Sequence, residues 1–155
     1  MSYYDRIQLG LRRDLGSYTF EEADIVQFAK RFDPQRFHLS QAGAADTHFG
    51  RLCASGWHTG SVWMKLNTSL WQKEIAAYVA DGNPPPPIGP SPGFENLQWI
   101  KPVFCGDTIT YFGTFTAKRP LKSRPGWAML NALNEGVNQE GDMVFRFEGH
   151  VMIGL

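Results

Sequence analysis

Apolar residues in the first half of the chain recur at helical spacing. After Thr19, one buried helix face is predicted by apolar positions i, i+3, i+4 and i+7, which are Ile25, Phe28, Ala29 and Phe32. Thr19 and Glu22 have the spacing of a capping box, so the helix is expected to begin at Thr19. Asp33-Pro34 is expected to end it, because proline disfavours helical backbone in the residue before it.

A second and longer helix is predicted to follow Ser55-Gly56-Trp57 and to reach about Tyr78. Its shared apolar face consists of Thr59, Val62, Trp63, Leu66 and Leu70. Ser55 suits the N-cap position, because its hydroxyl can accept a hydrogen bond from a free N–H of the first turn. The apolar start of this helix predicts that it is buried on several sides.

Three less regular segments complete the first half. An edge strand is expected around Arg6 to Leu11, and Ser40 is expected to cap a short helix over Gln41 to Asp46. The segment from Asp81 to Gly93 is rich in proline and glycine. It is predicted to be a stiff, extended connection without helix or ladder pairing.

The second half of the chain alternates between apolar and polar positions. The alternation is clearest where Ile109, Tyr111 and Phe115 share one face and threonines occupy the other. Turn signals at Gly106-Asp107 and Glu140-Gly141 separate the segments. The predicted strands are Leu97 to Ile100, Thr108 to Lys118, Ala128 to Asn138 and Met143 to Ile153. Helices followed by antiparallel strands predict an α+β fold, with the long helix packed on one face of a single sheet.

Composition narrows the class of protein. The chain has 155 residues, which fits one domain over 1–155, and its formal net charge is zero. Neither a nucleic-acid partner nor a membrane partner is expected, because there is no basic excess, no secretory signal and no long apolar run. The two cysteines lack CxxC spacing and the four histidines lack metal-binding spacing. We therefore expect free thiols, no metal site and a cytoplasmic location.

Asp33 and His38 form the one candidate acid–base pair. They lie five residues apart across a predicted non-helical turn, so a carboxylate and an imidazole can converge on one water. Such a pair can take a proton from water and return it to carbon. From the spacing alone, the alternative remains that Asp33 caps the turn and His38 is a solvated polar residue.

The second candidate feature is Ser55-Gly56 at the start of the long helix. A glycine there lets a substrate approach the backbone closely, and the free N–H groups with the helix dipole can receive a carbonyl oxygen that becomes an enolate. The alternative is a plain helix cap with glycine chosen for packing. His48, His58 and His150 have no legible acid or base partner and are expected to be structural.

Two sequence blocks, in this order, resemble the MaoC-like dehydratases, which include (R)-specific enoyl-CoA hydratases. FDPQRFH followed by FGRLCASGWHTGSVWMKL is similar to the hydratase motif and central helix of that family. GSPGFENLQWIKPVFCGDTIT is similar to the second block of the family. The resemblance runs from about Tyr18 to the C-terminus.

The resemblance implies a single hot-dog fold, in which an antiparallel sheet wraps around one long helix. It implies a homodimer, with sheets continuous across the partner, and leaves a dimer of dimers open. The implied reaction is reversible addition of water to a trans-2-enoyl thioester, giving the (R)-3-hydroxyacyl thioester. The substrate would be an acyl-CoA or acyl-carrier thioester, and no cofactor is expected beyond the coenzyme A of the substrate.

By position, Asp33 and His38 match the catalytic pair of the family. Gly56 matches the glycine whose backbone N–H binds the thioester oxygen, and Ser55 caps the same helix. The usual motif reads Asp-x-Asn-Pro-x-His, whereas this chain has Pro34-Gln35-Arg36 within the loop. A different loop shape is therefore expected.

The segment Asp81 to Pro92 lies where family members differ in covering the acyl tunnel, so it is a hypothesis for what sets acyl length. Two other functions remain open at this stage. A hot-dog acyl-CoA thioesterase more usually carries its carboxylate on or near the central helix, and no Asp or Glu lies between Gly56 and Lys73. A non-catalytic acyl-thioester binding module is the other alternative, because fold does not fix function.

Overall fold

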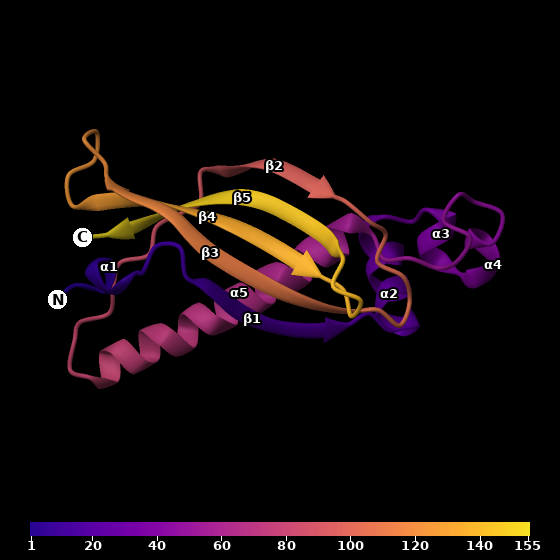
Figure 1. The fold of residues 1–155 in the computed structure, drawn as a ribbon, viewed down its shortest axis with the longest axis horizontal. Coiled ribbons are helices and arrows are strands. Elements are labelled where there is room, and N and C mark those ends of the chain that lie inside the picture. Colours follow the sequence, from indigo (N-terminus) through magenta and orange to yellow (C-terminus); the bar gives the residue numbers. More distant parts are fainter.

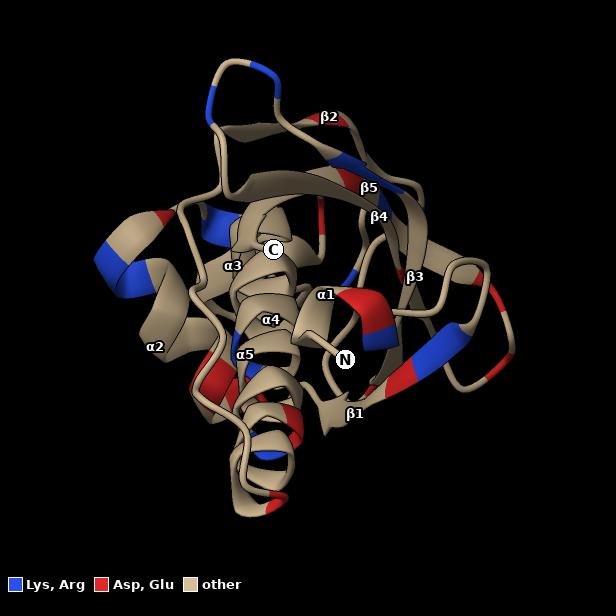
Figure 2. Cartoon of the chain, turned by 90° about the vertical axis from the view of Figure 1, so that its left-hand side faces the viewer, with Lys and Arg blue, Asp and Glu red and all other residues tan.

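A single antiparallel sheet curves around one long helix in the computed structural model, which describes residues 1–155. The strand order is β1-β3-β4-β5-β2, with β2 and β1 at the edges. Figure 2 shows the sheet arching over α5. This is the α+β hot-dog arrangement that the sequence predicts. The strands are β1 (Arg12–Thr19), β2 (Gly93–Trp99), β3 (Thr108–Pro120), β4 (Trp127–Val137) and β5 (Met143–Gly154).

The long helix, α5 (Gly56–Ala80), begins where the sequence predicts. The Ser55 hydroxyl accepts a hydrogen bond from the N–H of Trp57 at 3.3 Å, so Ser55 is the N-cap. Within one chain α5 is buried mainly on the side toward the sheet, while Trp57 and Met64 are half exposed. The prediction that this helix is buried on several sides is therefore wrong for the single chain.

The main core lies between α5 and the concave face of the sheet. The alternation on β3 is confirmed, because Ile109, Tyr111 and Phe115 are all buried. From α5, the predicted apolar face packs against this core through Val62, Trp63, Leu66 and Leu70. A smaller cluster around Phe115 fills the far end, where the N-terminal α1 (Tyr3–Arg6) covers it.

Two predictions near the N-terminus are wrong. The helix predicted to begin at Thr19, α2 (Glu22–Phe32), begins three residues later and has no side-chain cap. Thr19 instead ends β1, and its hydroxyl is hydrogen bonded to that of Thr108 on the neighbouring strand at 2.7 Å. The edge strand is β1 and not the segment around 6–11. It was not predicted because β1 buries only Leu15, so its sequence shows no clear alternation of apolar and polar residues.

The connection from α2 to α5 contains two short helices. Ser40 caps α4 (Gln41–Ala44) by accepting a hydrogen bond from the N–H of Gly43 at 2.9 Å, as predicted. The turn from Asp33 to His38 was predicted to be non-helical. This prediction is wrong for the second half of the turn, because His38 lies on the short helix α3 (Arg36–Leu39). Both helices lie at the end of the molecule opposite the chain termini (Figure 1).

The proline-rich connection after α5 is extended, as predicted, yet it also pairs with β5. Gly89 donates a backbone hydrogen bond to Met152, and Gly154 donates one to Pro87, both at 2.8 Å. Pro87 and Pro90 take part through their carbonyl oxygens, which accept and need no N–H, so the segment lengthens the sheet edge. No helix of the structure is both long enough and apolar enough to cross a membrane.

Candidate active site

The structure brings Asp33 and His38 together. Asp33 is the C-cap of α2, and His38 lies on α3, so the short connection turns both side chains toward each other. The Asp33 Oδ2 atom is 3.4 Å from His38 Nε2. His38 is only 5 % exposed, which rules out the alternative of a solvated histidine.

The backbone of Cys53 fixes the orientation of His38. The Nδ1 atom lies 2.6 Å from the carbonyl oxygen of Cys53. Because a carbonyl oxygen only accepts, Nδ1 carries the proton that makes this bond. In a neutral imidazole, Nε2 is then the acceptor nitrogen, and it faces the Asp33 carboxylate.

The Asp33 carboxylate is held ionised by its neighbours. Its Oδ1 atom accepts a hydrogen bond from Gln35 Nε2 at 2.7 Å. Burial raises the pKa of Asp33, but hydrogen bonds from Gln35 and Ser55 and the charge of His38 outweigh it, so the pKa is lowered from its ordinary value of 3.8. The departure from the family motif at Gln35 therefore supplies a direct contact to the carboxylate.

Gly56 presents a free donor at the start of α5. Its N–H donates no hydrogen bond within the chain, as expected for the first residue of a helix, where the helix dipole is positive. A Cβ atom at this position would overlap the indole ring of Trp99. Glycine is thus required for packing, and its amide remains available to a ligand.

A cavity of about 410 Å³ joins these features. His38, Gly56 and Gln35 all line it, and Asp33 is outside the lining, next to Gln35 and His38. The wall is largely apolar, which suits an acyl chain. The remaining lining residues are Phe37, Phe49, Cys53, Ala54, Thr59, Trp99, Lys101, Pro102, Val103 and Val144.

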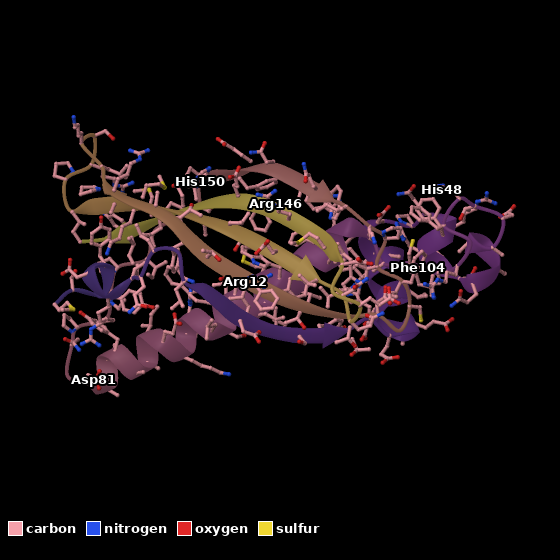
Figure 3. All side chains as sticks on the ribbon, viewed as in Figure 1. Arg12, His48, Asp81, Phe104, Arg146 and His150 are labelled. Carbon is pink, nitrogen blue, oxygen red and sulfur yellow. The ribbon has the colours of Figure 1, made fainter.

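The cavity contains none of the residues 81–92. Figure 3 shows Asp81 at the end of α5 opposite to His48 and Phe104, which lie near the α3–α4 end. Part of the segment 81–92 pairs instead with the C-terminal end of β5. The hypothesis that this segment covers the acyl tunnel is therefore wrong for this cavity.

Three contributors to the site were missed in the sequence: Trp99 over Gly56, Gln35 on the Asp33 carboxylate and the carbonyl of Cys53 behind His38. Only Gln35 had a signal, because it occupies the asparagine position of the family motif. No group of three or more His, Cys, Asp or Glu side chains is arranged to hold a metal ion.

The hot-dog fold, with a carboxylate and an imidazole facing each other beside an apolar cavity, defines the structural class of this protein. The family profile described as MaoC like domain matches residues 9–126, and the chain belongs to this family of MaoC-like dehydratases. The MaoC-like dehydratase from Rhodospirillum rubrum is 32% identical, with a TM-score of 0.78 over 97% of this chain and 94% of that one.

More distant relatives cover nearly the whole chain. The (R)-hydratase PhaJ1 from Pseudomonas aeruginosa is 23% identical, with a TM-score of 0.68 over 96% of this chain and 83% of that one, and it shares the fold. The uncharacterised protein YdeM of Bacillus subtilis is 27% identical over 149 residues, which is 96% of both chains. The match thus extends over most of the length of both relatives.

Proposed function

We propose that the chain is a hydratase/dehydratase that adds water reversibly to a trans-2-enoyl thioester and gives the (R)-3-hydroxyacyl thioester. The observation that carries this proposal is that His38 Nε2 faces Asp33 Oδ2 at 3.4 Å, beside a cavity lined by His38 and Gly56. The two atoms are farther apart than the roughly 2.7–2.9 Å of a direct charge-assisted hydrogen bond. Both are acceptors when His38 is neutral, so both can accept from the same water.

The reaction then needs only a proton taken and a proton returned. As the water oxygen bonds to C3 of the enoyl group, the pair receives one proton from the water, and it returns one proton to C2. His38 Nε2 is the nitrogen available for this step, because Nδ1 is committed to the Cys53 carbonyl. Addition of water involves no net oxidation or reduction, so we propose no cofactor beyond the coenzyme A or carrier of the substrate.

Gly56 is proposed to bind the thioester oxygen. Negative charge moves onto this oxygen when C3 is attacked, and a free N–H at a helix N-terminus stabilises such an enolate. Ser55 supports the same feature by capping α5, and its hydroxyl contributes to lowering the pKa of the Asp33 carboxyl. The two halves of the site are thereby linked through one side chain.

The thioesterase alternative is disfavoured by the composition of α5, which has no acidic side chain before Glu74. A binding module would need the cavity but not the facing acceptors of Asp33 and His38. The chemistry of the pair therefore favours the hydratase over both alternatives.

The functional unit is proposed to be a homodimer. Strand β2 is a sheet edge, and Phe94, Trp99 and Ile100 on or beside it are exposed apolar side chains, as is Trp57 on α5. An unpaired edge with exposed apolar residues is suited to pairing with a second copy. Analytical ultracentrifugation is expected to give twice the mass of one chain, and a monomer at micromolar concentration would contradict this assembly.

The experiment that tests the proposed function follows the absorbance of the conjugated enoyl thioester. Purified protein is mixed with crotonyl-CoA, and a thiol reagent reports any free coenzyme A. A fall in absorbance without thiol release is the expected result. Thiol release would identify a thioesterase, and binding without either change would identify a binding module.

Replacing Gln35 by Ala is expected to lower kcat by about tenfold and to move the acid limb of the pH profile to higher pH. The amide of Gln35 lowers the pKa of Asp33, so its loss raises that pKa. As the pH is lowered, the activity that needs ionised Asp33 is therefore lost at a higher pH in the variant than in the wild type. The measurement is kcat against pH, with Gln72→Ala on the exposed side of α5 as control; an unshifted acid limb would show that Gln35 does not act on Asp33.

A further inference from the structure

His58, near the start of α5, is enclosed by aromatic rings from two other elements. Its imidazole stacks on the ring of Phe28 of α2, with centroids 4.7 Å apart and planes 6° apart. The rings of Phe20 and Tyr18 stand edge-on to it, with centroids at 4.9 and 6.3 Å. Phe20 is itself held in place, because its backbone makes two hydrogen bonds of 2.9 Å with the turn at 106–107. The imidazole therefore joins α5 to α2 and to the end of β1.

The burial of His58 is not matched by hydrogen bonding. The residue is 7 % exposed, and its Nδ1 atom is buried without a partner. A neutral ring tolerates this position better than an imidazolium, which has a charge to solvate and a donor on each ring nitrogen. Burial accordingly lowers the pKa of His58 from its ordinary value of 6.5, and the Asp24 carboxylate opposes this shift without cancelling it.

Few charged or titratable groups lie around His58. Those that line the cavity of about 220 Å³ beside its ring are Tyr18 of β1 and Asp24 and Arg31 of α2. The Asp24 carboxylate already accepts a hydrogen bond from the Tyr18 hydroxyl at 2.8 Å. On α5 itself, no other charged residue precedes Lys65. A protonated His58 would therefore face one cation and one carboxylate that already has a partner.

The two helices that His58 joins carry the two halves of the active site. Asp33 is the C-cap of α2 and follows Phe28 by five residues, which is about one and a half turns. Gly56 is the first residue of α5 and precedes His58 by two residues. A movement of α2 relative to α5 would therefore change the position of the Asp33 carboxylate relative to the Gly56 amide.

We propose that His58 is a positioning residue that, while neutral, holds α2 against α5 and so keeps Asp33 in place beside the start of α5. Protonation puts a charge among the aromatic rings and opens this contact, so the link is sensitive to acid. The fully buried residues of α2, Ile25 and Ala29, are apolar and do not respond to pH. The expected effect on rate rests on the proposed function, whereas the expected effect on stability does not.

The acid sensitivity is tested by urea unfolding at about pH 7.5 and about pH 5.5, on either side of the ordinary value of 6.5. The folded chain binds this proton more weakly than the unfolded chain. The stability that neutral His58 contributes is therefore complete above 6.5 and is lost as the pH falls below it. The fall in the urea midpoint is expected to be at least halved in His58→Phe, which keeps an aromatic stack and cannot be protonated.

His58→Gln makes the same test with a smaller side chain, should the phenylalanine variant fail to fold. His48→Gln, at an exposed histidine, is the matched control and is expected to keep the wild-type fall. A wild-type fall of the midpoint in both His58 variants would overturn the inference.

The positioning role is tested by kcat and KM for crotonyl-CoA at about pH 7.5. His58→Ala removes the stack and is expected to lower kcat by about tenfold. The KM is expected to stay near the wild-type value, because His58 does not line the active-site cavity. His58→Phe is expected to recover most of the lost kcat, since it restores a ring against Phe28.

A wild-type kcat in His58→Ala, or no recovery in His58→Phe, would overturn the positioning role while leaving the hydratase intact. Absence of hydration by the wild type would instead refute the proposed function, and the unfolding comparison then decides the inference by itself.

Discussion

Replacing Asp33 by Asn is expected to lower kcat for enoyl-thioester hydration by about a thousandfold, with acyl-CoA binding retained. The amide is nearly the same size, so the cavity, which Asp33 does not line, keeps its shape. What is lost is the ionised acceptor that faces His38 Nε2 at 3.4 Å. A water that both groups must orient can no longer be held and deprotonated.

His38→Gln is expected to show a loss of similar size, because it removes the only ring nitrogen that is free to take a proton. The double variant is expected to be little worse than either single one, since residues that act as a unit are strongly non-additive. Steady-state kinetics with crotonyl-CoA and calorimetric binding of a saturated acyl-CoA measure the two effects. Asp46→Asn, an exposed carboxylate that pairs with Arg36, is the matched control. More than a tenth of wild-type kcat in Asp33→Asn would show that the pair is not the catalytic centre.

Replacing Gly56 by Ala is expected to destabilise the fold by about 1–3 kcal/mol, because the new methyl group overlaps the indole of Trp99. The hydration rate is expected to fall as well, since the displaced indole changes the cavity wall next to the amide that is proposed to bind the thioester oxygen. Thermal unfolding and kcat/KM measure the two effects.

Two matched variants isolate the cause of this effect. Gly60→Ala, one turn later on the same helix, adds a methyl group at an ordinary contact distance of 3.8 Å from Phe145 and is expected to be tolerated. In a Trp99→Ala background, the cost of Gly56→Ala is expected to shrink, because the overlapping ring is absent. An undiminished cost in that background would mean that the close approach of Trp99 is not the reason for the glycine.

Local patterns were sufficient to predict the main elements. The 3.6-residue period from Thr59 to Leu70 and the hydroxyl of Ser55 define α5, and the two-residue period around Ile109 and Tyr111 defines β3. These patterns reflect burial on one face, which the hydrophobic effect imposes directly on the sequence. The edge strand β1 escaped the same reasoning because only Leu15 is buried in it.

Contacts between distant segments were not predictable in this way. The orientation of His38 depends on the Cys53 carbonyl, and the need for Gly56 depends on Trp99, 43 residues away by number. Such contacts form only when separate segments of the chain come together in the folded structure. The spacing of Asp33 and His38 therefore indicated a candidate acid–base pair, whereas the tautomer of His38 and the cavity beside it required the three-dimensional structure.

The most direct test of the central claim is mass spectrometry of the products formed from crotonyl-CoA in water that carries heavy oxygen. A hydratase is expected to give an intact 3-hydroxyacyl-CoA with one heavy oxygen in its hydroxyl group, in the (R) configuration, and Asp33→Asn is expected to give almost none. Heavy oxygen in the carboxylate of a free acid, with coenzyme A released, would contradict the account. Unlabelled and unchanged crotonyl-CoA after long incubation with the wild type would contradict it as well.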